Sequence, residues 1–300
     1  MNTPFNIIRH SKVWLGISGA IIVAALVALA VFGLNFGIDF TGGSLLQVNA
    51  PATNVEALRD VVHNGGFDSV VQKGEGDTYF IRLAPITEEQ HQTLLTAVQL
   101  VSPTATETRF DTVGPVIGEQ LKGASVKATL LMLALITVYV AWAFRKVTRP
   151  VASWKYGVVT MISAFHDVII PLGVFAVLGK VFGYQIDLAF VAAMLTILGY
   201  SINDTIVVLD RTRENLLRHR HRDTSFGDVV NTSVMETLAR SMNTTFAALL
   251  PLLAVFIVGG ATTRSFVLAL IIGMLSGAYS SIFVASPLLV EWEKFRASRT

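Results

Sequence analysis

Six long apolar stretches dominate the pattern of hydrophobic and polar positions along the chain. The first runs from Val13 to Ile38, 26 residues without a charge, and the others cover about 124–144, 154–178, 186–210, 237–259 and 264–290. A helix needs about 20 apolar residues to cross a bilayer, whereas the core of a cleaved signal peptide has roughly 7–15 residues. The pattern therefore predicts a polytopic α-helical membrane protein with six transmembrane helices.

Between the first two stretches, residues 37–122 regain charged side chains and take the periodicities of strands and helices. Strands are expected at Ser44–Asn49, Ser69–Lys73, Thr78–Leu83 and Thr104–Val113, and helices, each opened by a Thr-x-x-Glu/Gln capping box, at Thr53–Asn64 and Thr87–Val101. This β-α-β-β-α-β order predicts an α+β ferredoxin-like extracytoplasmic domain. Because it has no cluster of metal-ligating side chains, we expect an interaction or lever domain rather than an enzyme.

The expected organisation is therefore helix 1 within residues 1–36, a periplasmic domain at 37–122, and helices 2–6 within 123–300. Residues 113–119 are interpreted as the descent back to the membrane, and residues 211–236 as a loop between helices 4 and 5. The loop contains an Arg- and His-rich cluster at 218–222. This cluster is typical of a solvated loop, with contact to anionic lipid or a partner as the alternative.

The distribution of basic residues predicts the orientation of the helices. The segments assigned to the cytoplasm hold Arg9, Lys12, Arg145, Lys146, Arg149, Lys155, Arg211, Arg213, Arg218, Arg220, Arg222, Lys294, Arg296 and Arg299. The far longer outer segments hold only Arg59, Lys73, Arg82, Arg109, Lys122, Lys127, Lys180 and Arg264. Since cytoplasmic loops carry the excess of Lys and Arg, both termini are predicted inside and residues 37–122 outside.

A glycine-rich motif opens the external region. It reads Gly37, Ile38, Asp39, Phe40, Thr41, Gly42 and Gly43. A phosphate-binding loop is one interpretation, but no Gly-Lys-Ser/Thr follows and no helix is expected directly after Gly43. A membrane-exit turn is favoured.

The fourth apolar stretch contains two adjacent polar residues, Asn203 and Asp204. An Asp at the centre of a membrane helix costs about 2.5 to 3.5 kcal/mol, so it normally faces the bundle interior and marks an ion or substrate path. The structural alternative is a buried polar knot that only fixes helix packing. We favour a functional role for Asp204.

Arg240 lies about as far beyond the 211–236 loop as Asp204 lies before it. If helices 4 and 5 are antiparallel neighbours, the two side chains have a similar depth and are able to pair. A nearby cation favours the ionised carboxylate and desolvation disfavours it, so a mobile partner lets such a group take up and release a proton. The sequence therefore predicts a proton relay at Asp204 and Arg240.

His166 and Asp167 form a second polar pair, in the third apolar stretch. Neighbouring residues of a helix point about 100° apart, so the two side chains are a weak metal site. A supporting role in proton transfer and a structural hydrogen bond both remain open. Near the last stretch, Gly273-Met-Leu-Ser-Gly277 is typical of close helix packing within the subunit or against a partner.

Composition agrees with the membrane assignment: 52% of residues are hydrophobic, 15% are charged and the mean hydropathy is +0.59. With no cysteine, the chain has no disulfide, thiolate metal site or cysteine nucleophile. Its Ser, His and Asp residues make no recognisable triad. No cofactor, bound metal, catalytic residue or nucleic-acid partner is predicted, and an enzyme is the least favoured class.

These motifs resemble the SecF family, subunits of the SecDF protein-export accessory complex in the resistance-nodulation-division superfamily. The likeness covers essentially the whole chain and rests on residues 37–43, Val113-Gly-Pro115, His166-Asp-Val168, the 199–215 segment around Asp204, and Thr237-Leu-Ala-Arg240. The functional Asp of the family falls on Asp204 and its intramembrane Arg on Arg240. Two departures are visible: Ser241 stands where Thr is usual, and the preceding loop is about two residues longer. We expect neither to touch the charged pair.

The resemblance implies a multi-pass protein of the bacterial cytoplasmic (inner) membrane without its own ATPase. With SecD it would use the proton motive force to complete the translocation of unfolded preproteins through SecYEG, after SecA has pushed them. YidC and YajC would be further partners. Six helices with one external domain are half of a superfamily transporter, so a SecD-like partner supplies the other half. A small-molecule exporter and a membrane chaperone without proton coupling are the alternatives.

Overall fold

The computed structural model describes residues 6–74, 76–145, 152–218 and 224–297. The chain divides into two compact units. The first contains residues 1–34, 128–181 and 189–300, and the second contains residues 35–127 and 182–188.

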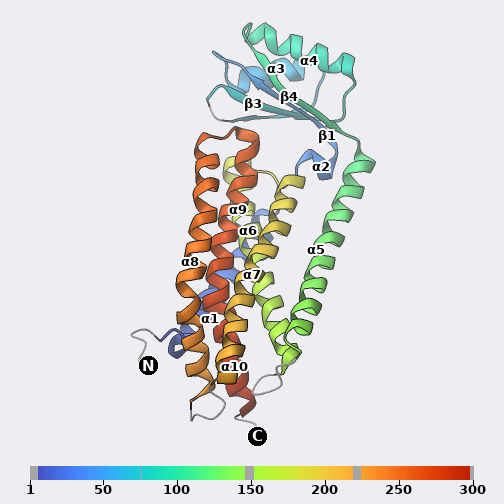
Figure 1. Ribbon diagram of the computed structural model, residues 1–300. Coiled ribbons are helices and arrows are strands. Elements are labelled where there is room, and N and C mark those ends of the chain that lie inside the picture. Colours follow the sequence, from blue (N-terminus) through green and yellow to red (C-terminus); the bar gives the residue numbers. More distant parts are fainter. Residues whose placement is uncertain (1–5, 75, 146–151, 219–223, 298–300) are drawn as a thin grey trace. The chain divides into compact units, whose positions relative to one another are not determined.

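The first unit is helical, and Figure 1 shows its long helices running alongside one another. A short 3-10 helix (Ile8–His10) precedes α1. The long helices are α1 (Ser11–Phe32), α5 (Pro115–Ala143), α6 (Ser153–Phe182), α7 (Leu188–Arg218), α8 (Phe226–Val258) and α9 (Ala261–Ser280), the last continued by the π-helix η2 (Ser281–Ala285) and by α10 (Ser286–Ala297). Six helical spans among the described residues are long and apolar enough to cross a membrane.

Two glycines of α9 let it pack closely against α7. The sequence predicted close helix packing for the Gly273–Gly277 segment. A Cβ atom on Gly273 would lie 2.2 Å from Ile197 Cδ1, and one on Gly277 would lie 2.7 Å from Ser201 Cβ. Such small residues let two helix backbones approach, which is the main source of helix affinity in lipid. Ser201 of α7 is therefore held directly against α9.

The 211–236 loop is much shorter than its hydropathy predicted. α7 continues to Arg218 because ion pairs along the helix support its polar end: Arg213 to Asp210 at 2.7 Å, and Arg211 and Arg218 to Glu214 at 2.5 Å each. α8 already begins at Phe226, where Ser225 accepts a hydrogen bond from the Asp228 N–H. Residues 219–223 of the Arg- and His-rich cluster lie outside the described residues.

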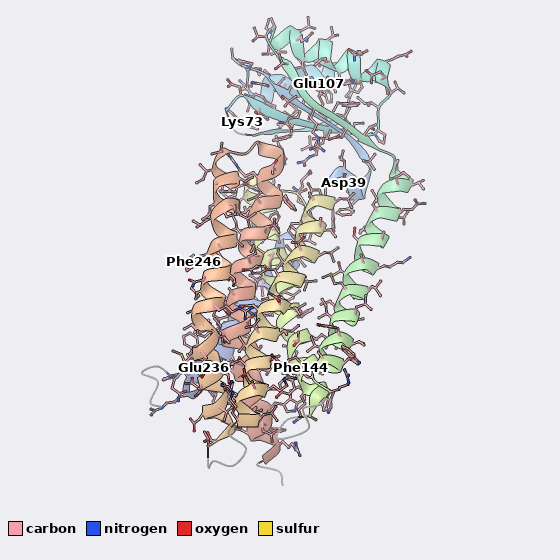
Figure 2. The ribbon with its side chains drawn as sticks, in the orientation of Figure 1. Asp39, Lys73, Glu107, Phe144, Glu236 and Phe246 are labelled. Atoms are coloured by element: carbon pink, nitrogen blue, oxygen red, sulfur yellow. The ribbon has the colours of Figure 1, made fainter. Side chains whose placement is uncertain are left out.

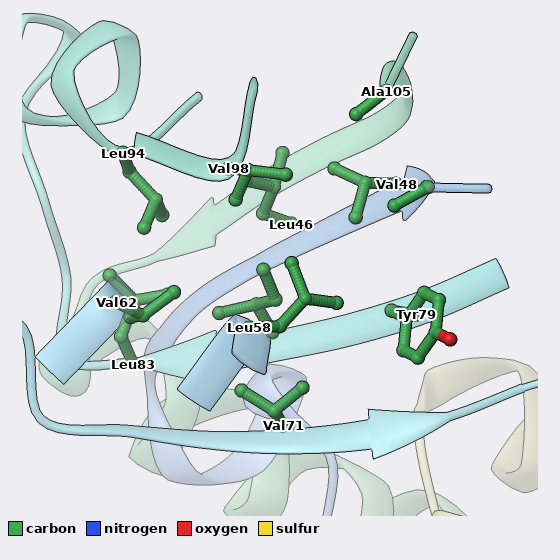
Figure 3. Packing of buried hydrophobic residues seen from close by; sticks show 12 residues of the cluster. Leu46, Val48, Leu58, Val62, Val71, Tyr79, Leu83, Leu94, Val98 and Ala105 are labelled. Carbon is green, nitrogen blue, oxygen red and sulfur yellow. The ribbon is translucent and has the colours of Figure 1, made fainter. Parts of the chain in front are cut away.

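The second unit contains a four-stranded antiparallel sheet in the order β2-β3-β1-β4. Its strands are β1 (Gly43–Asn49), β2 (Ser69–Lys73), β3 (Thr78–Leu83) and β4 (Thr106–Val113), and its helices are the one-turn α2 (Ile38–Thr41), α3 (Val55–Asn64) and α4 (Glu88–Val101). Leu46 of the central strand β1 faces Ile81 on β3 and Phe110 on β4. Side chains of α3 and α4, including Leu58 and Leu94, pack with the sheet residues into a buried core (Figure 3).

Three local predictions for this unit need correction. Asn54, not a Thr53 capping box, caps α3 by accepting the Ala57 N–H at 2.8 Å. β4 begins at Thr106 rather than Thr104. The expected descent at 113–119 is largely helical, because α5 begins at Pro115, a residue suited to the first position of a helix. The Thr87 capping box of α4 is confirmed, with Gln90 as its partner.

Candidate functional site

Asp204 lies on the buried side of α7 and contacts α8. Its side chain is 7% exposed, and Oδ1 accepts a hydrogen bond from Ser241 Oγ at 2.6 Å. The second oxygen, Oδ2, is buried and has no hydrogen-bond partner among the described residues. A buried carboxylate with one oxygen unsatisfied is costly as an anion, so a proton on Oδ2 is readily accommodated.

Asp204 and Arg240, which the sequence made able to pair, are joined by no ion pair within 4.0 Å in the described part of the chain. Arg240 is exposed on α8, while its neighbour Ser241 is fully buried. Successive helix residues point about 100° apart, so the contact of Ser241 with Asp204 turns Arg240 outward. The depth argument pointed to this turn of α8, and within the turn Ser241 makes the hydrogen bond to Asp204.

Ser241 also corrects the expectation that the departure from Arg-Thr lies away from the charged pair. Its hydroxyl is the one hydrogen-bond donor to Asp204 that the described residues supply. Serine and threonine carry the same donor, so the substitution retains the bond. Asn203, the other residue of the expected polar knot, is exposed and does not join it.

A second polar centre lies between α6, α7 and α9, around Asp167. Its Oδ1 accepts hydrogen bonds from His166 Nδ1 at 2.9 Å and Ser276 Oγ at 3.0 Å. Its Oδ2 accepts from Ser201 Oγ at 2.5 Å and Ser280 Oγ at 2.7 Å. Both His166 and Asp167 are fully buried. The adjacent His and Asp thus bond each other and gather three hydroxyls from two other helices.

The glycine-rich motif ties three segments of the second unit together. Gly42 and Gly43 have φ angles of +72° and +123°, and a Cβ atom on either would lie 2.8 Å from backbone, that of Pro115 and Leu83 respectively. Only glycine fits such conformations and approaches. The motif therefore packs the start of β1 against the start of α5 and the end of β3.

The other residues of the motif fix this turn to the segment before α7. The Gly37 N–H donates to the Ile186 carbonyl at 2.8 Å, and Asp39 Oδ2 accepts the N–H of Leu188 at 2.9 Å, at the first residue of α7. A carboxylate at a helix N-terminus satisfies a free N–H and complements the helix dipole. Thr41 Oγ1 donates to the Gly37 carbonyl at 3.1 Å, and Phe40 is buried. Figure 2 labels Asp39 at this turn.

The second unit also has a cavity of 290 Å³ beside the motif, lined by Phe36, Ile38, Thr41, Gly42, Asp68, Ser69, Val70, Arg82, Leu83 and Gln185. Burial lowers the pKa of Arg82 to about 10. The described residues contain no group of three or more His, Asp or Glu side chains able to hold a metal ion.

Sequence reasoning missed the serine hydroxyls. Ser201, Ser276 and Ser280 donate to Asp167, and Ser241 donates to Asp204. Serine is common in membrane helices as a small packing residue, so its type alone gives no signal. The one available signal, which went unused, is the spacing of Ser276 and Ser280, one turn apart in an apolar helix, because residues so spaced share a helix face.

Comparison with known families matches two descriptions to this chain. "Protein export membrane protein SecD/SecF, C-terminal" covers residues 93–295, and "SecD/SecF GG Motif" covers residues 27–50, which include the glycine-rich turn. The two matches together reach from α1 to α10.

Individual relatives agree. The protein translocase subunit SecF of Thermobaculum terrenum is 39% identical over 96% of this chain and 94% of its own length, and that of Anaerolinea thermophila is 36% identical over the same shares. The protein translocase subunit SecDF of Thermus thermophilus is 39% identical, and the match covers 94% of this chain but 38% of that longer protein.

Solved structures show the same likeness. The crystal structure of SecDF from Thermus thermophilus, described as a translocon-associated membrane protein, superposes with a TM-score of 0.86 at 34% identity, over 98% of this chain and 39% of that one. A SecDF structure in the super-membrane-facing form superposes with a TM-score of 0.72 at 34% identity, over 100% of this chain and 40% of that one. The chain therefore belongs to the SecD/SecF family of protein-export membrane proteins.

Proposed function

We propose that this chain is the SecF half of a proton-driven SecD/SecF complex in the bacterial cytoplasmic membrane. Its likeness to SecF subunits extends over nearly their full length, and the fused SecDF relative, of which it matches 38%, indicates that a SecD half completes the assembly. The complex takes unfolded preproteins emerging from SecYEG after SecA has pushed them, near YidC and YajC, with no cofactor and no ATPase of its own.

One observation carries the proton-driven part of this proposal: a buried carboxylate with a free oxygen beside an exposed polar face. Next to Asp204, the side chains of Asn203 on α7 and of Arg240, Asn243 and Thr244 on α8 are exposed. Polar groups facing hydrocarbon are costly, so this face suits a partner half or a water-filled path rather than lipid. Apolar side chains such as Phe246, 56% exposed, continue the outer surface of α8 towards lipid (Figure 2).

In this mechanism a proton arrives at Asp204 Oδ2 from the polar face. Its arrival removes the negative charge to which Arg240 and the Ser241 hydroxyl respond, so the packing of α7 against α8 changes. One elementary charge crossing about 100 mV is worth about 2.3 kcal/mol, enough to bias a two-state movement tens-fold. The movement is passed to the external domain, which pulls the emerging chain outward.

The topology belongs to the same proposal. Both termini and the loop between α7 and α8 lie in the cytoplasm, as the distribution of Lys and Arg favours. The external domain at 37–122 is a ferredoxin-like unit, supported by its β2-β3-β1-β4 order and by two helices that share one core with the sheet. The glycine-rich motif is the membrane-exit turn at which this domain begins.

The test is translocation of a preprotein into inverted membrane vesicles that contain this chain and its SecD-like partner. With an imposed proton gradient, Asp204→Asn and Arg240→Met lose the gradient-dependent increment and keep the gradient-independent level. Asp210→Asn makes the same chemical change at an exposed position of α7 and is expected to retain the increment. A normal increment in Asp204→Asn, with normal assembly, would support a chaperone without proton coupling.

A further inference from the structure

We propose that His166 and Asp167 form a second proton-binding site on the transport path, separate from Asp204, in which one proton binds the pair and is held at His166 Nε2. The proposal rests on the proton-driven function given above. It assigns a chemical role to the polar centre between α6, α7 and α9.

Asp167 is built to be an anion. Each of its four contacts is a donor: His166 Nδ1 and the hydroxyls of Ser201, Ser276 and Ser280, at distances of 2.5–3.0 Å. Carboxylates that accept several hydrogen bonds strongly favour the ionised form. The carboxyl group is also fully buried, so its charge has to be balanced nearby.

His166 supplies that balance only when it carries a second proton. Because a carboxylate is an acceptor only, Nδ1 bears the hydrogen that points to Asp167. Nε2 is then either a bare lone pair or a second N–H, and it is buried without a hydrogen-bond partner among the described residues. The Ser163 hydroxyl, one turn earlier on α6, is likewise buried and unpartnered in the described structure.

The charge balance makes this pair a binding site for a proton. With neutral His166 the pair carries a net charge of −1, and with Nε2 protonated its net charge is zero. An unbalanced charge in a membrane interior is costly, whereas a well-bonded ion pair is tolerated. The two groups exchange one proton as a unit, and its removal leaves a charge that the surrounding helices must accommodate.

The surroundings of the ring contain few other titratable groups. Within the described residues, Asp167 is the acid on α6, Tyr279 stacks on the imidazole from α9 with ring centroids 6.0 Å apart, and α7 contributes the Ser201 hydroxyl through Asp167. Tyr279 in turn shares a hydrogen bond with Ser18 of α1 at 3.0 Å. The electron-rich face of the tyrosine ring stabilises a protonated imidazole.

Ser201 and η2 connect this pair to Asp204. Ser201 lies one helical turn before Asp204 on α7, so a change in the charge of Asp167 reaches the same helix. Ser280 is directly followed by the π-helix Ser281–Ala285, where Ser281 bonds Thr205 of α7 at 2.9 Å. Interruptions of this kind occur often at functional sites, where they let a helix shift locally.

The first measurement follows the protonation of His166 directly, by NMR of isotope-labelled histidine in the complex held in lipid nanodiscs. The chain has six histidines, and the difference from His166→Gln assigns the signal. We expect an Nδ1–H tautomer that gains a proton on Nε2 when the pH is lowered. The titration should persist in Asp204→Asn. A His166 that keeps one protonation state throughout overturns the proposal, whatever the fate of the Asp204 mechanism.

The second measurement places the proton on the transport path. His166→Gln keeps an N–H able to donate to Asp167 but has no site for a second proton, so we expect it to lose gradient-driven translocation while assembling normally. His63→Gln makes the same chemical change at an exposed position of α3 and should keep the wild-type activity. Wild-type gradient-driven translocation in His166→Gln would overturn the proposal and leave the pair a packing contact.

Discussion

At the scale of single residues, a hydroxyl next to a charged group decides how the membrane carboxylate is held. Ser241 donates to Asp204 at 2.6 Å, while Arg240 points outward from α8. Removing a donor to a buried charged group typically costs about 1.5–3 kcal/mol. Ser241 therefore acts on Asp204 through a hydrogen bond, whereas Arg240 acts on it only through its charge. We expect the loss of the two side chains to affect translocation differently.

Ser241→Ala should raise the proton affinity of Asp204, because the anion loses its donor while the protonated form loses less. The pH at which gradient-driven translocation is half-maximal is expected to rise, by about one unit for about 1.4 kcal/mol. Ser241→Thr restores the hydroxyl and should match the wild-type profile. An unchanged profile in Ser241→Ala would show that this bond does not tune the carboxylate.

At the scale of elements, the close crossing of α7 and α9 sets the geometry of both polar centres. Gly277→Ala places a Cβ atom 2.7 Å from Ser201 Cβ, so the helices must separate. We expect a lower thermal unfolding midpoint, reflecting a loss of about 1–3 kcal/mol from overpacking, and weaker gradient-driven translocation. Gly19→Ala in α1, where nothing lies within 4 Å, is the matched control and should behave as wild type. Equal midpoints for the two variants would contradict this account.

Periodicity predicted the elements well where a single physical signal determines them. β2 and β3 have the predicted bounds, Ser69–Lys73 and Thr78–Leu83, because alternation and a glycine turn define each end. The polar extension of α7 to Arg218 was missed, since hydropathy ends at Asp210 and the helix continues on ion pairs. At the site, a charged residue in an apolar stretch was enough to identify Asp204. The serine donors could not be predicted, because they depend on which helices pack together, and a local stretch of sequence does not determine that.

At the scale of the whole molecule, the glycine-rich motif bonds the first residue of α7, the helix that carries Asp204. Asp39 caps α7 at Leu188, and α7 continues unbroken past Asp204, about four helical turns on.

Asp39→Ala removes this cap and should cost about 1 kcal/mol of stability, seen as a small fall in the unfolding midpoint. Gradient-driven translocation should fall further than the midpoint explains, because the start of α7 is freed from the motif. Asp39→Asn keeps an oxygen acceptor, so its unfolding midpoint and its translocation should lie between those of the wild type and of Asp39→Ala. If Asp39→Ala lowers stability and leaves translocation intact, the motif is a structural clasp and not a coupling element.

The exposed polar face of α7 and α8 also has a consequence for the life of the newly made protein. A subunit that reaches the bilayer alone presents Asn203 and Arg240 to hydrocarbon, a mismatch that proteolytic quality control can recognise. Burial by the second half would hide this signal, so the residues that we propose for transport would also make the cellular amount of this chain follow the amount of its partner. The two subunits would then be kept at equal amounts without a dedicated regulator, because copies of this chain without a partner would be degraded.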